Sequence, residues 1–394
     1  MKWNKWMLAT VAGVMLLAGC TPNKAEKEEE EGFMQQSEDE DVETTHIPSR
    51  QLSDNYYRTL VPYKESVTRG LVVSNINTKY DIKEAENGLM RISQNEFSTN
   101  DYYFQEGQYL SQSTVENWLA RPNQTTEESP ENQGLNPSSV DEETGAALDP
   151  IVRAEIAPVY LAHIVEQNYL KKTGENKISL GGISLGLAMN SIYYYQREQY
   201  GEFYERPIED AELKREGEKI AQEIIERLRL RPELEDVPIL IGLFKQEARN
   251  SVVPGTYMQY AVSDPGKNTL GEWIQLNEQY VTFPMTSPED KYRDMNVAFL
   301  KFKQEIDLYF SNLTSVIGTG FYKEDRIQKL EVEIPIQFFG TAEIIGFTQY
   351  LTGVMLNSLP QDLPVVISVT SMNGPEALIK KMPNEDEPFV HIYE

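Results

Sequence analysis

Hydrophobic positions recur along this chain with two different periods, and the periods predict helices and strands. Apolar residues three to four positions apart mark amphipathic helices. Shorter runs rich in β-branched and aromatic residues mark strands. The expected helices are 82–97, 154–172, 211–230, 287–316 and 341–356. The expected strands or extended segments are 55–63, 178–195, 236–243, 256–262, 280–283, 330–339, 362–369, 377–381 and 389–393.

Two stretches of the chain have the same order of expected elements. Residues 178–243 and 330–369 each read as a strand, a helix and a second strand opened by an Asp-apolar-Pro sequence. The prolines of these sequences, Pro238 and Pro364, stand 126 positions apart. A proline at the first strand position removes no central ladder bond. We predict an α+β fold of duplicated strand-helix-strand(-strand) units with mixed or antiparallel sheets.

The first twenty residues have the pattern of an export signal. Lys2 and Lys5 precede an uncharged, mainly apolar run over 7–18, which is too short to span a hydrocarbon core of ~30 Å. A positive start, a short apolar run and small residues before a cut site are typical of a secretory signal peptide. Leu17-Ala18-Gly19-Cys20 resembles the lipobox of bacterial lipoproteins. This resemblance implies a diacylglyceryl thioether on Cys20 and cleavage by signal peptidase II between Gly19 and Cys20.

The charge and the cysteine content narrow the classes of partner. The chain has 62 acidic and 36 basic residues and a net charge of −26, which becomes −28 when Lys2 and Lys5 leave with the signal. Such a charge repels nucleic acid and anionic lipid headgroups. The single cysteine excludes an internal disulfide. Acidic runs between residues 21 and 50 predict a disordered tether. A calcium-binding acidic run is the alternative, but no glycine-punctuated loop is present to fix a coordination geometry.

These patterns divide the chain into five expected parts. They are a signal peptide over 1–19, a lipidated, acidic, disordered tether over 20–50, an N-terminal α+β segment ending in a mobile loop over 51–150, a first repeat unit over 151–285, and a linking helix with a second repeat unit over 286–394.

Candidate catalytic chemistry is sparse in this sequence. Gly182-Ile183-Ser184-Leu185-Gly186 matches the G-x-S-x-G elbow of hydrolases, but an apolar run continues past Ser184 where an elbow needs a turn and a helix. Glycines that thin a packed strand are the favoured interpretation, and a cell-envelope hydrolase using Ser184 is the alternative. The histidines are His46, His163 and His391, too scattered for an expected metal site, so we expect no enzyme, no metal and no cofactor.

Aromatic clusters offer a second kind of candidate site. Tyr193-Tyr194-Tyr195, Phe338-Phe339 and Tyr350 could line a groove for sugar or peptide. Packing in a core or on a half-buried strand is the favoured interpretation of each cluster.

Motifs spread over the chain carry a resemblance to a known family. They are Asn55-Tyr56-Tyr57-Arg58-Thr59-Leu60, Pro62, Lys64-Glu65-Ser66, Arg69-Gly70-Leu71, Gly134-Leu135-Asn136-Pro137-Ser138, Gly186-Leu187-Ala188-Met189-Asn190-Ser191, Tyr193-Tyr194-Tyr195, Phe310-Ser311-Asn312, Gly340-Thr341-Ala342-Glu343, Glu387-Pro388 and Val390-His391-Ile392-Tyr393. Together with the lipobox, they resemble the CamS-type sex-pheromone lipoprotein precursors of Gram-positive bacteria.

The resemblance implies two products from one chain. The mature part would be a lipoprotein that the lipoprotein-processing enzymes anchor by lipid to the extracellular face of the cell membrane. Apart from the resemblance, we keep a wall fragment or a peptide as the candidate ligand of the mature part. The signal peptide would be trimmed to a short apolar pheromone that is read by a receptor. The corresponding residues here are Ala12, Gly13, Val14, Met15, Leu16, Leu17, Ala18 and Gly19.

Overall fold

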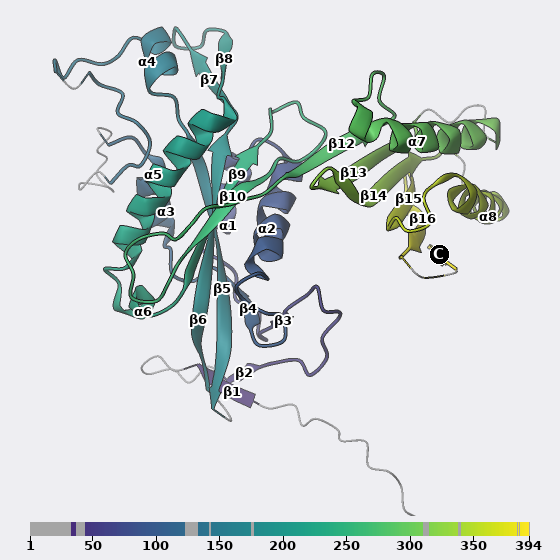
Figure 1. Cartoon of the computed structure of the whole chain (residues 1–394), viewed down its shortest axis with the longest axis horizontal. Coiled ribbons are helices and arrows are strands. Elements are labelled where there is room, and N and C mark those ends of the chain that lie inside the picture. Colours follow the sequence, from purple (N-terminus) through teal and green to yellow (C-terminus); the bar gives the residue numbers. More distant parts are fainter. Residues whose placement is uncertain are drawn as a thin grey trace, which may run out of the picture.

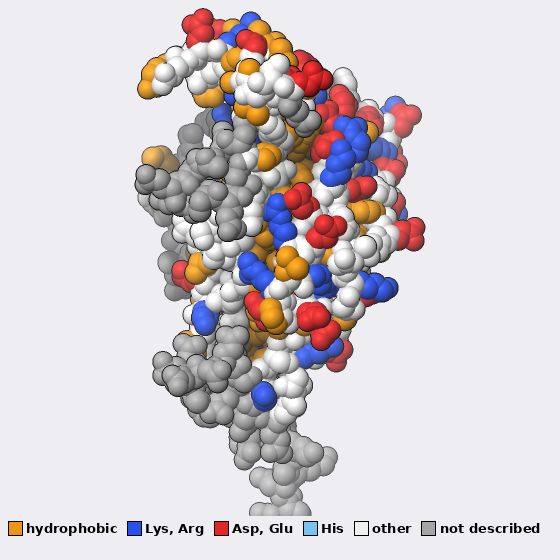
Figure 2. Space-filling view, turned by 90° about the vertical axis from the view of Figure 1, so that its left-hand side faces the viewer, with side chains coloured by type: hydrophobic (Ala, Val, Ile, Leu, Met, Phe, Trp, Pro, Cys, Tyr) orange, Lys and Arg blue, Asp and Glu red, His pale blue; other side chains and the backbone are white. Residues whose placement is uncertain are grey.

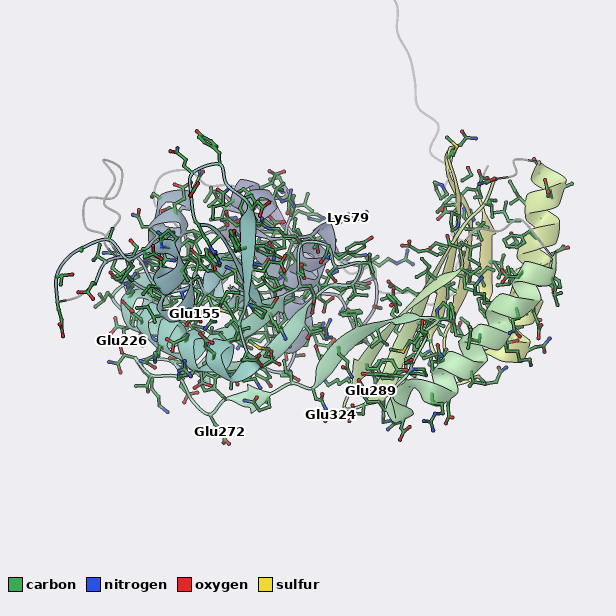
Figure 3. All side chains as sticks on the ribbon, turned by 90° about the horizontal axis from the view of Figure 1, so that it is seen from above. Lys79, Glu155, Glu226, Glu272, Glu289 and Glu324 are labelled. Atoms are coloured by element: carbon green, nitrogen blue, oxygen red, sulfur yellow. The ribbon has the colours of Figure 1, made fainter. Side chains whose placement is uncertain are left out.

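The chain folds into two α+β bodies joined side by side (Figure 1; Figure 3). The computed structural model describes residues 33–36, 44–122, 133–141, 143–174, 177–309, 315–337, 340–383, 385 and 387–393. Seen from above, Glu155, Glu226 and Glu272 lie on the first body, and Glu289 and Glu324 lie on the second (Figure 3). Among the helices of this described part, none is long and apolar enough to cross a membrane.

The first body is built on a mixed sheet whose strands run in the order β11-β10-β9-β6-β5-β4-β3. The strands of this sheet are β3 (Arg58–Thr59), β4 (Tyr103–Glu106), β5 (Leu161–Gly174), β6 (Lys177–Asn190), β9 (Ile239–Gln246), β10 (Thr256–Ser263) and β11 (Ile274–Gln275). Two short strands, β1 (Phe33–Gln36) and β2 (Thr44–His46), pair with each other, and β1 also pairs with β6. A separate hairpin consists of β7 (Ile192–Gln196) and β8 (Phe203–Pro207).

Helices cover both faces of this sheet, which explains the long apolar runs of its central strands. Side chains of α1 (Arg69–Asn75) and α2 (Lys79–Ser93) pack on one face with Leu240 and Phe244. Side chains of α3 (Gln112–Leu119) and α5 (Asp210–Leu228) pack on the other face with Ile239 and Ile241. The remaining helices of this body are α4 (Pro150–Ile156) and α6 (Pro232–Glu235).

The second body is a mixed sheet with helices on one face. Its strands run in the order β12 (Glu278–Phe283), β13 (Ile317–Lys323), β14 (Arg326–Pro335), β15 (Val365–Ser371), β16 (Gly374–Lys381) and β17 (Phe389–Ile392). The helices are α7 (Asp290–Tyr309) and α8 (Thr341–Ser358). Much of β14 alternates between buried and exposed residues, as expected of a sheet with one solvated face.

The two sheets repeat one connectivity, as the duplicated strand-helix-strand pattern predicted. In the first, β6, α5 and β9 form a parallel crossover and β10 returns antiparallel. In the second, β14, α8 and β15 form the same crossover and β16 returns antiparallel. The two prolines also correspond, because Ile183 N donates to Pro238 O at 3.1 Å and Leu330 N donates to Pro364 O at 2.9 Å.

The expected helix over 154–172 is wrong. The structure ends α4 at Ile156 and forms the long strand β5 from Leu161. Because helices cover both faces of the sheet, β5 is buried on both sides and lacks the simple alternation that marks a half-buried strand. The apolar residues Ile156, Tyr160, Ile164 and Tyr169, on which the expected helix rested, are spaced as in a helix, but the last two lie on β5.

Other boundaries also differ from the expectation. The expected strand 178–195 is two strands, β6 and β7, which lie in different sheets. The extended segment 55–63 contains only the two-residue strand β3. Residues 280–283, expected in the first repeat unit, belong to β12 and pair with β13 of the second sheet. Part of the expected disordered tether forms β1 and β2. The pairing of β6 with β9 begins only at Ile183, so the first residues of β6 have a free edge, and Gln35 and Gln36 of β1 pair there.

Candidate functional site

A cavity of ≈ 130 Å³ with a mixed polar and apolar lining lies in the first body between α1, α2 and strands β4 and β5. A single water needs only about 10–15 Å³ of such volume, so the cavity has room for several waters or one small polar molecule. Carboxylate, amide, hydroxyl, guanidinium and imidazole groups share the lining with a few apolar side chains. The polar and charged lining residues are Ser66, Thr68, Arg69, Glu86, Asn87, Glu106, His163, Glu166 and Gln167.

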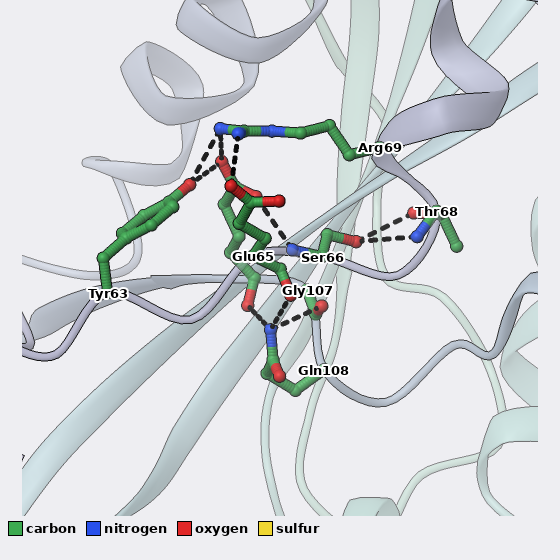
Figure 4. Close-up of polar contacts among 8 residues, drawn as sticks. Tyr63, Glu65, Ser66, Thr68, Arg69, Gly107 and Gln108 are labelled. Atoms are coloured by element: carbon green, nitrogen blue, oxygen red, sulfur yellow. Dashed lines mark hydrogen bonds and ion pairs between the residues drawn. The ribbon is translucent and has the colours of Figure 1, made fainter.

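Glu106 at the end of β4 fastens the segment that closes the cavity, residues 61–68, here called the α1 loop. Arg69 Nη2 donates to Glu106 Oε1 at 2.6 Å, and the Tyr63 hydroxyl donates to the same oxygen (Figure 4). Ser66 N donates to Glu106 Oε2 at 2.9 Å. Burial and the nearby Glu106 carboxylate raise the pKa of the Tyr63 phenol, so the phenol stays a hydrogen-bond donor.

Glu166 on β5 fastens the segment that follows β4. Its carboxylate accepts hydrogen bonds from the backbone N–H groups of Gln108 at 3.0 Å, Tyr109 at 2.9 Å and Leu110 at 2.7 Å. Burial raises the pKa of this carboxyl, and the three backbone bonds act against that rise. A Cβ on the neighbouring Gly107 would meet the Glu166 side chain, so this close approach requires glycine.

His163 is the imidazole of the cavity wall, and it is fully buried. Its Nδ1 lies 3.5 Å from Asn75 Nδ2, and its Nε2 has no hydrogen-bond partner among the described residues. Burial lowers the pKa of His163 to about 4, so the ring is neutral at pH 7. Burial also raises the pKa of Glu86 on the facing helix, and the Glu106 charge adds to that rise.

The hydroxyl groups of the cavity lining come from the α1 loop. The two hydroxyls of the lining, Ser66 Oγ and Thr68 Oγ1, lie 2.9 Å apart and bond to each other. Within the described part of the chain, no bond joins either hydroxyl to the His163 ring, as a nucleophile and its general base would require. The cavity therefore offers donors and acceptors to a small polar ligand.

Ser184 does not sit on a nucleophile elbow. It is fully buried in the middle of β6, and its hydroxyl accepts from Ser93 Oγ at 2.7 Å. The glycines of the motif make room for aromatic rings, because a Cβ on Gly182 would strike Phe97 and a Cβ on Gly186 would strike the Tyr257 hydroxyl. The favoured interpretation, glycines in a packed strand, agrees with this arrangement.

The other residues singled out in the sequence do not converge. His46, His163 and His391 lie on β2, β5 and β17. Tyr350 is a packing residue between helices, because its hydroxyl donates to Glu305 O at 2.9 Å. In the part of the chain that the structure describes, no three His, Cys, Asp or Glu side chains gather as a metal site would require. Cys20, the cleavage motif over 17–20, the peptide over 12–19 and Phe338-Phe339 lie outside the described residues.

Sequence reasoning missed the cavity residues Glu86, Glu106 and Glu166, and it placed His163 on a helix. Ser66 and Arg69 were the available signals, since both belong to motifs that resemble the family and both line the cavity. Glu106 and Glu166 stand 60 positions apart and meet only through the β4–β5 pairing.

Comparisons with known proteins agree on one family. The family model described as "CamS sex pheromone cAM373 precursor" matches residues 63–387. The structure of the C-terminal domain of the sex pheromone staph-cAM373 precursor from Staphylococcus aureus is similar, with 32% identity, a TM-score of 0.70, and coverage of 81% of this chain and 98% of that one. A sex pheromone precursor from Lactobacillus salivarius subsp. salivarius UCC118 is similar with 30% identity, a TM-score of 0.78, and coverage of 89% and 99%. Curated protein sequences gave no match.

Proposed function

Because this chain belongs to the CamS sex pheromone precursor family, we propose that it is a lipid-anchored extracellular lipoprotein whose signal peptide becomes a short apolar pheromone. The observation that carries the proposal is the lipobox-like Leu17-Ala18-Gly19-Cys20, which precedes the matched residues 63–387 in the chain. A diacylglyceryl group on Cys20 supplies two acyl chains, and two chains give stable anchoring where one is marginal.

The mature part acts as a binding or scaffold module on the outer face of the membrane. Support comes from the cavity beneath α1, whose hydroxyls bond to each other, and from the buried position of Ser184 in mid-strand. The strong negative charge keeps this module off anionic lipid headgroups. On the face around α5, basic side chains are interspersed with acidic ones (Figure 2).

Replacing the acylated thiol tests the anchor. Cys20→Ala should leave the folded protein as an unlipidated precursor or a secreted form. Immunoblots should then show its loss from membranes washed in high salt. Thr21→Ala, one position further on, is the matched control and should stay with the membrane. Retention of the Cys20→Ala protein in washed membranes would show that something other than a lipid on Cys20 holds it.

The released peptide is tested in the same cultures. Mass spectrometry of the supernatant should find an apolar peptide ending at Gly19 in the parent strain. The Cys20→Ala strain should lack it, because the resemblance places the cut after acylation. Fragments cut only inside residues 14–17 would leave a lipoprotein of this family that is not a pheromone source.

A further inference from the structure

A second, larger hollow lies at one end of the first body, separate from the cavity beneath α1. This groove of ≈ 570 Å³ forms where the end of α1, the start of β5, the end of β6 and the strand β7 meet. Its polar and aromatic lining includes Asn75, Asn77, Asn190, Tyr193, Tyr194 and Arg249. None of these residues contributes to the wall of the first cavity.

Hydrogen bonds hold the amides in the floor of the groove in fixed orientations. Gln246 Nε2 donates to Asn190 Oδ1 at 2.6 Å, and Asn190 Nδ2 donates to Val159 O at 3.0 Å. The backbone N–H of Asn77 donates to Gln246 Oε1 at 2.9 Å, and Asn77 Nδ2 donates to Glu247 O at 2.8 Å. Because these side chains are already ordered, binding a ligand here costs little side-chain conformational entropy.

Arg249 places an exposed cation at the edge of this floor. Its guanidinium carbon lies 4.1 Å from the centre of the Tyr194 ring and 5.7 Å from that of Phe203, and its backbone N–H donates to the Tyr194 hydroxyl at 3.2 Å. Among the described residues, no carboxylate pairs with Arg249, although acidic residues outnumber basic ones by 62 to 36 in the chain. The guanidinium is held by rings, and its N–H groups are left for a planar anion such as a carboxylate.

Two aromatic residues of β7, Tyr193 and Tyr194, line the groove, and the other rings of the β7–β8 hairpin lie outside its lining. The rings of Tyr193 and Tyr195 stack with centroids 5.9 Å apart, and the Tyr195 and Tyr204 centroids lie 5.7 Å apart. Phe203 at the start of β8 is 63% exposed. Half-exposed ring faces beside fixed amides suit sugar rings, which present C–H groups on one face and hydroxyls at their edge.

The groove also lies at the far end of the sheet from the N-terminal strands. The strand β6 begins at Lys177, which pairs with Gln35 of β1, and ends at Asn190 in the floor of the groove. At ~3.3 Å per residue, β6 separates the two ends by about 40 Å. A lipid anchor before β1 would therefore leave the groove open to material farther from the membrane.

We propose that this groove binds a glycan that carries carboxylate groups. Arg249 takes a carboxylate, the rings of Tyr193 and Tyr194 take the faces of neighbouring sugars, and the amides of the floor take hydroxyl or acetamido groups. Only one part of this proposal, the kind of glycan chosen as ligand, rests on the proposed extracellular location. The test of glycan binding uses purified protein, and the test of lipid anchoring uses cell fractions. Either proposal can therefore fail while the other is confirmed.

The test measures binding by the full-length chain, purified in detergent micelles, with isothermal titration calorimetry. The acidic probe is a tetrasaccharide of alternating N-acetylglucosamine and N-acetylmuramic acid with free lactyl carboxylates. The neutral probe is chitotetraose, which has the same backbone without the carboxylates. Tetraglutamate is the peptide probe. We expect the acidic glycan to bind, with the neutral glycan and the peptide weaker by about tenfold or more, since a charge-assisted bidentate contact is among the stronger hydrogen-bonded contacts.

Two matched variants locate the site. Arg249→Ala should weaken binding of the acidic glycan by about tenfold or more. Arg197→Ala is the control, because Arg197 is also exposed and lies 3.9 Å from the centre of the Tyr204 ring on the same hairpin, but outside the groove lining. It removes the same charge and should change affinity by less than about twofold. Equal losses in the two variants, equal affinity for the neutral glycan, tighter binding of the peptide, or no binding of the acidic glycan would each overturn the proposal.

Discussion

The imidazole of His163 is fully buried on β5, beside a cavity that three carboxylate side chains also line. Those carboxylates come from three elements, with Glu86 on α2, Glu106 on β4 and Glu166 on β5. Arg69 on α1 faces the same space, and Asn75 Nδ2 lies near the ring. Burial nevertheless decides the state of the ring, since it lowers the pKa of His163 from 6.5 to about 4.

This lowered pKa predicts a loss of stability in weak acid. The unfolded chain takes up a proton on His163 near pH 6.5, while the folded chain resists protonation down to about pH 4. The contribution of His163 is therefore complete above pH 6.5 and lost as the pH falls toward 4, by up to about 3 kcal/mol. Urea unfolding at several pH values should show the wild type losing this much relative to His163→Asn.

The comparison between variants is needed because other groups titrate in the same range. The pKa values of Glu86 and Glu166 are raised by burial, which favours the folded state in acid and opposes the effect of His163. His391→Asn, at an exposed position on β17, is the control and should follow the wild type at every pH. A stability difference between wild type and His163→Asn that does not change with pH would contradict the expectation.

At the scale of elements, α1 and its loop form a cover that is held by few contacts. Glu106 contacts three residues of this cover, namely Tyr63, Ser66 and Arg69. Only Val72 of α1 is buried. Segments with few buried apolar contacts open at lower free energy than the core, so the cover should open before the sheet does.

Removing the charge of Glu106 tests that hierarchy. Glu106→Gln should raise the amide exchange rates of residues 63–75 by about 10–100-fold, which corresponds to about 1–3 kcal/mol for weakened charge-assisted hydrogen bonds. Hydrogen exchange read by mass spectrometry would check this, with unchanged exchange in β6 and β9. Glu65→Gln removes only an exposed contact to Arg69 at 3.4 Å and should leave the rates near those of wild type. Equal exchange in the two variants would show that Glu106 does not hold the cover.

At the scale of the whole molecule, one buried charge cluster joins the two bodies. Arg91 Nη2 on α2 donates to Glu84 Oε1 at 2.6 Å and to Glu278 Oε2 of β12 at 2.7 Å. The Tyr280 hydroxyl donates to Glu84 Oε2 at 2.8 Å, and the Arg91 guanidinium carbon lies 4.7 Å from the centre of the Phe321 ring. The cluster thus ties a helix of the first body to two strands of the second.

Arg91→Met should weaken this junction more than it weakens either core. The change leaves the buried carboxylate of Glu84 without its cation and leaves Glu278 with only Lys323 Nζ at 3.9 Å, a loss of about 3–5 kcal/mol. Calorimetry should show one unfolding transition for the wild type and two for Arg91→Met, and small-angle scattering of the variant should show a wider distribution of shapes. Arg293→Met breaks the exposed pair with Asp290 and should cost less than about 0.5 kcal/mol. A single sharp transition with unchanged scattering in Arg91→Met would place the coupling elsewhere.

The elements that the sequence predicted well are those whose pattern is local. The helices α2, α5 and α8 show a period of three to four residues or lie between clear breakers, and each falls within a few residues of its expected range. The prolines before β9 and β15 marked strand starts correctly. The strand β5 was missed because burial on both faces removes the alternation by which strands are recognised.

Neither the cavity beneath α1 nor the groove beside β7 could be predicted from local sequence patterns. Arg69, Glu106 and His163 meet only after α1 docks on the sheet and β4 pairs with β5. The tyrosines of β7 were visible as an aromatic run, but their partner Arg249 follows β9, more than fifty positions later. Chemistry assembled from such distant segments leaves no spacing that a reader of one sequence can recognise.

The pairing of β1 with β6 gives the first body a mechanical property. Two residue pairs hold β1 to β6 in parallel, and three hold it to β2. Under tension from the proposed anchor, β1 carries the load first, and these few pairs yield before the fourteen-residue strands of the core. Their release lets out residues 33–46, about 45–50 Å of extended chain at ~3.3–3.6 Å per residue. The N-terminal strands would then lengthen the link to the anchor under load, and the core sheet would bear force only after this segment is fully extended.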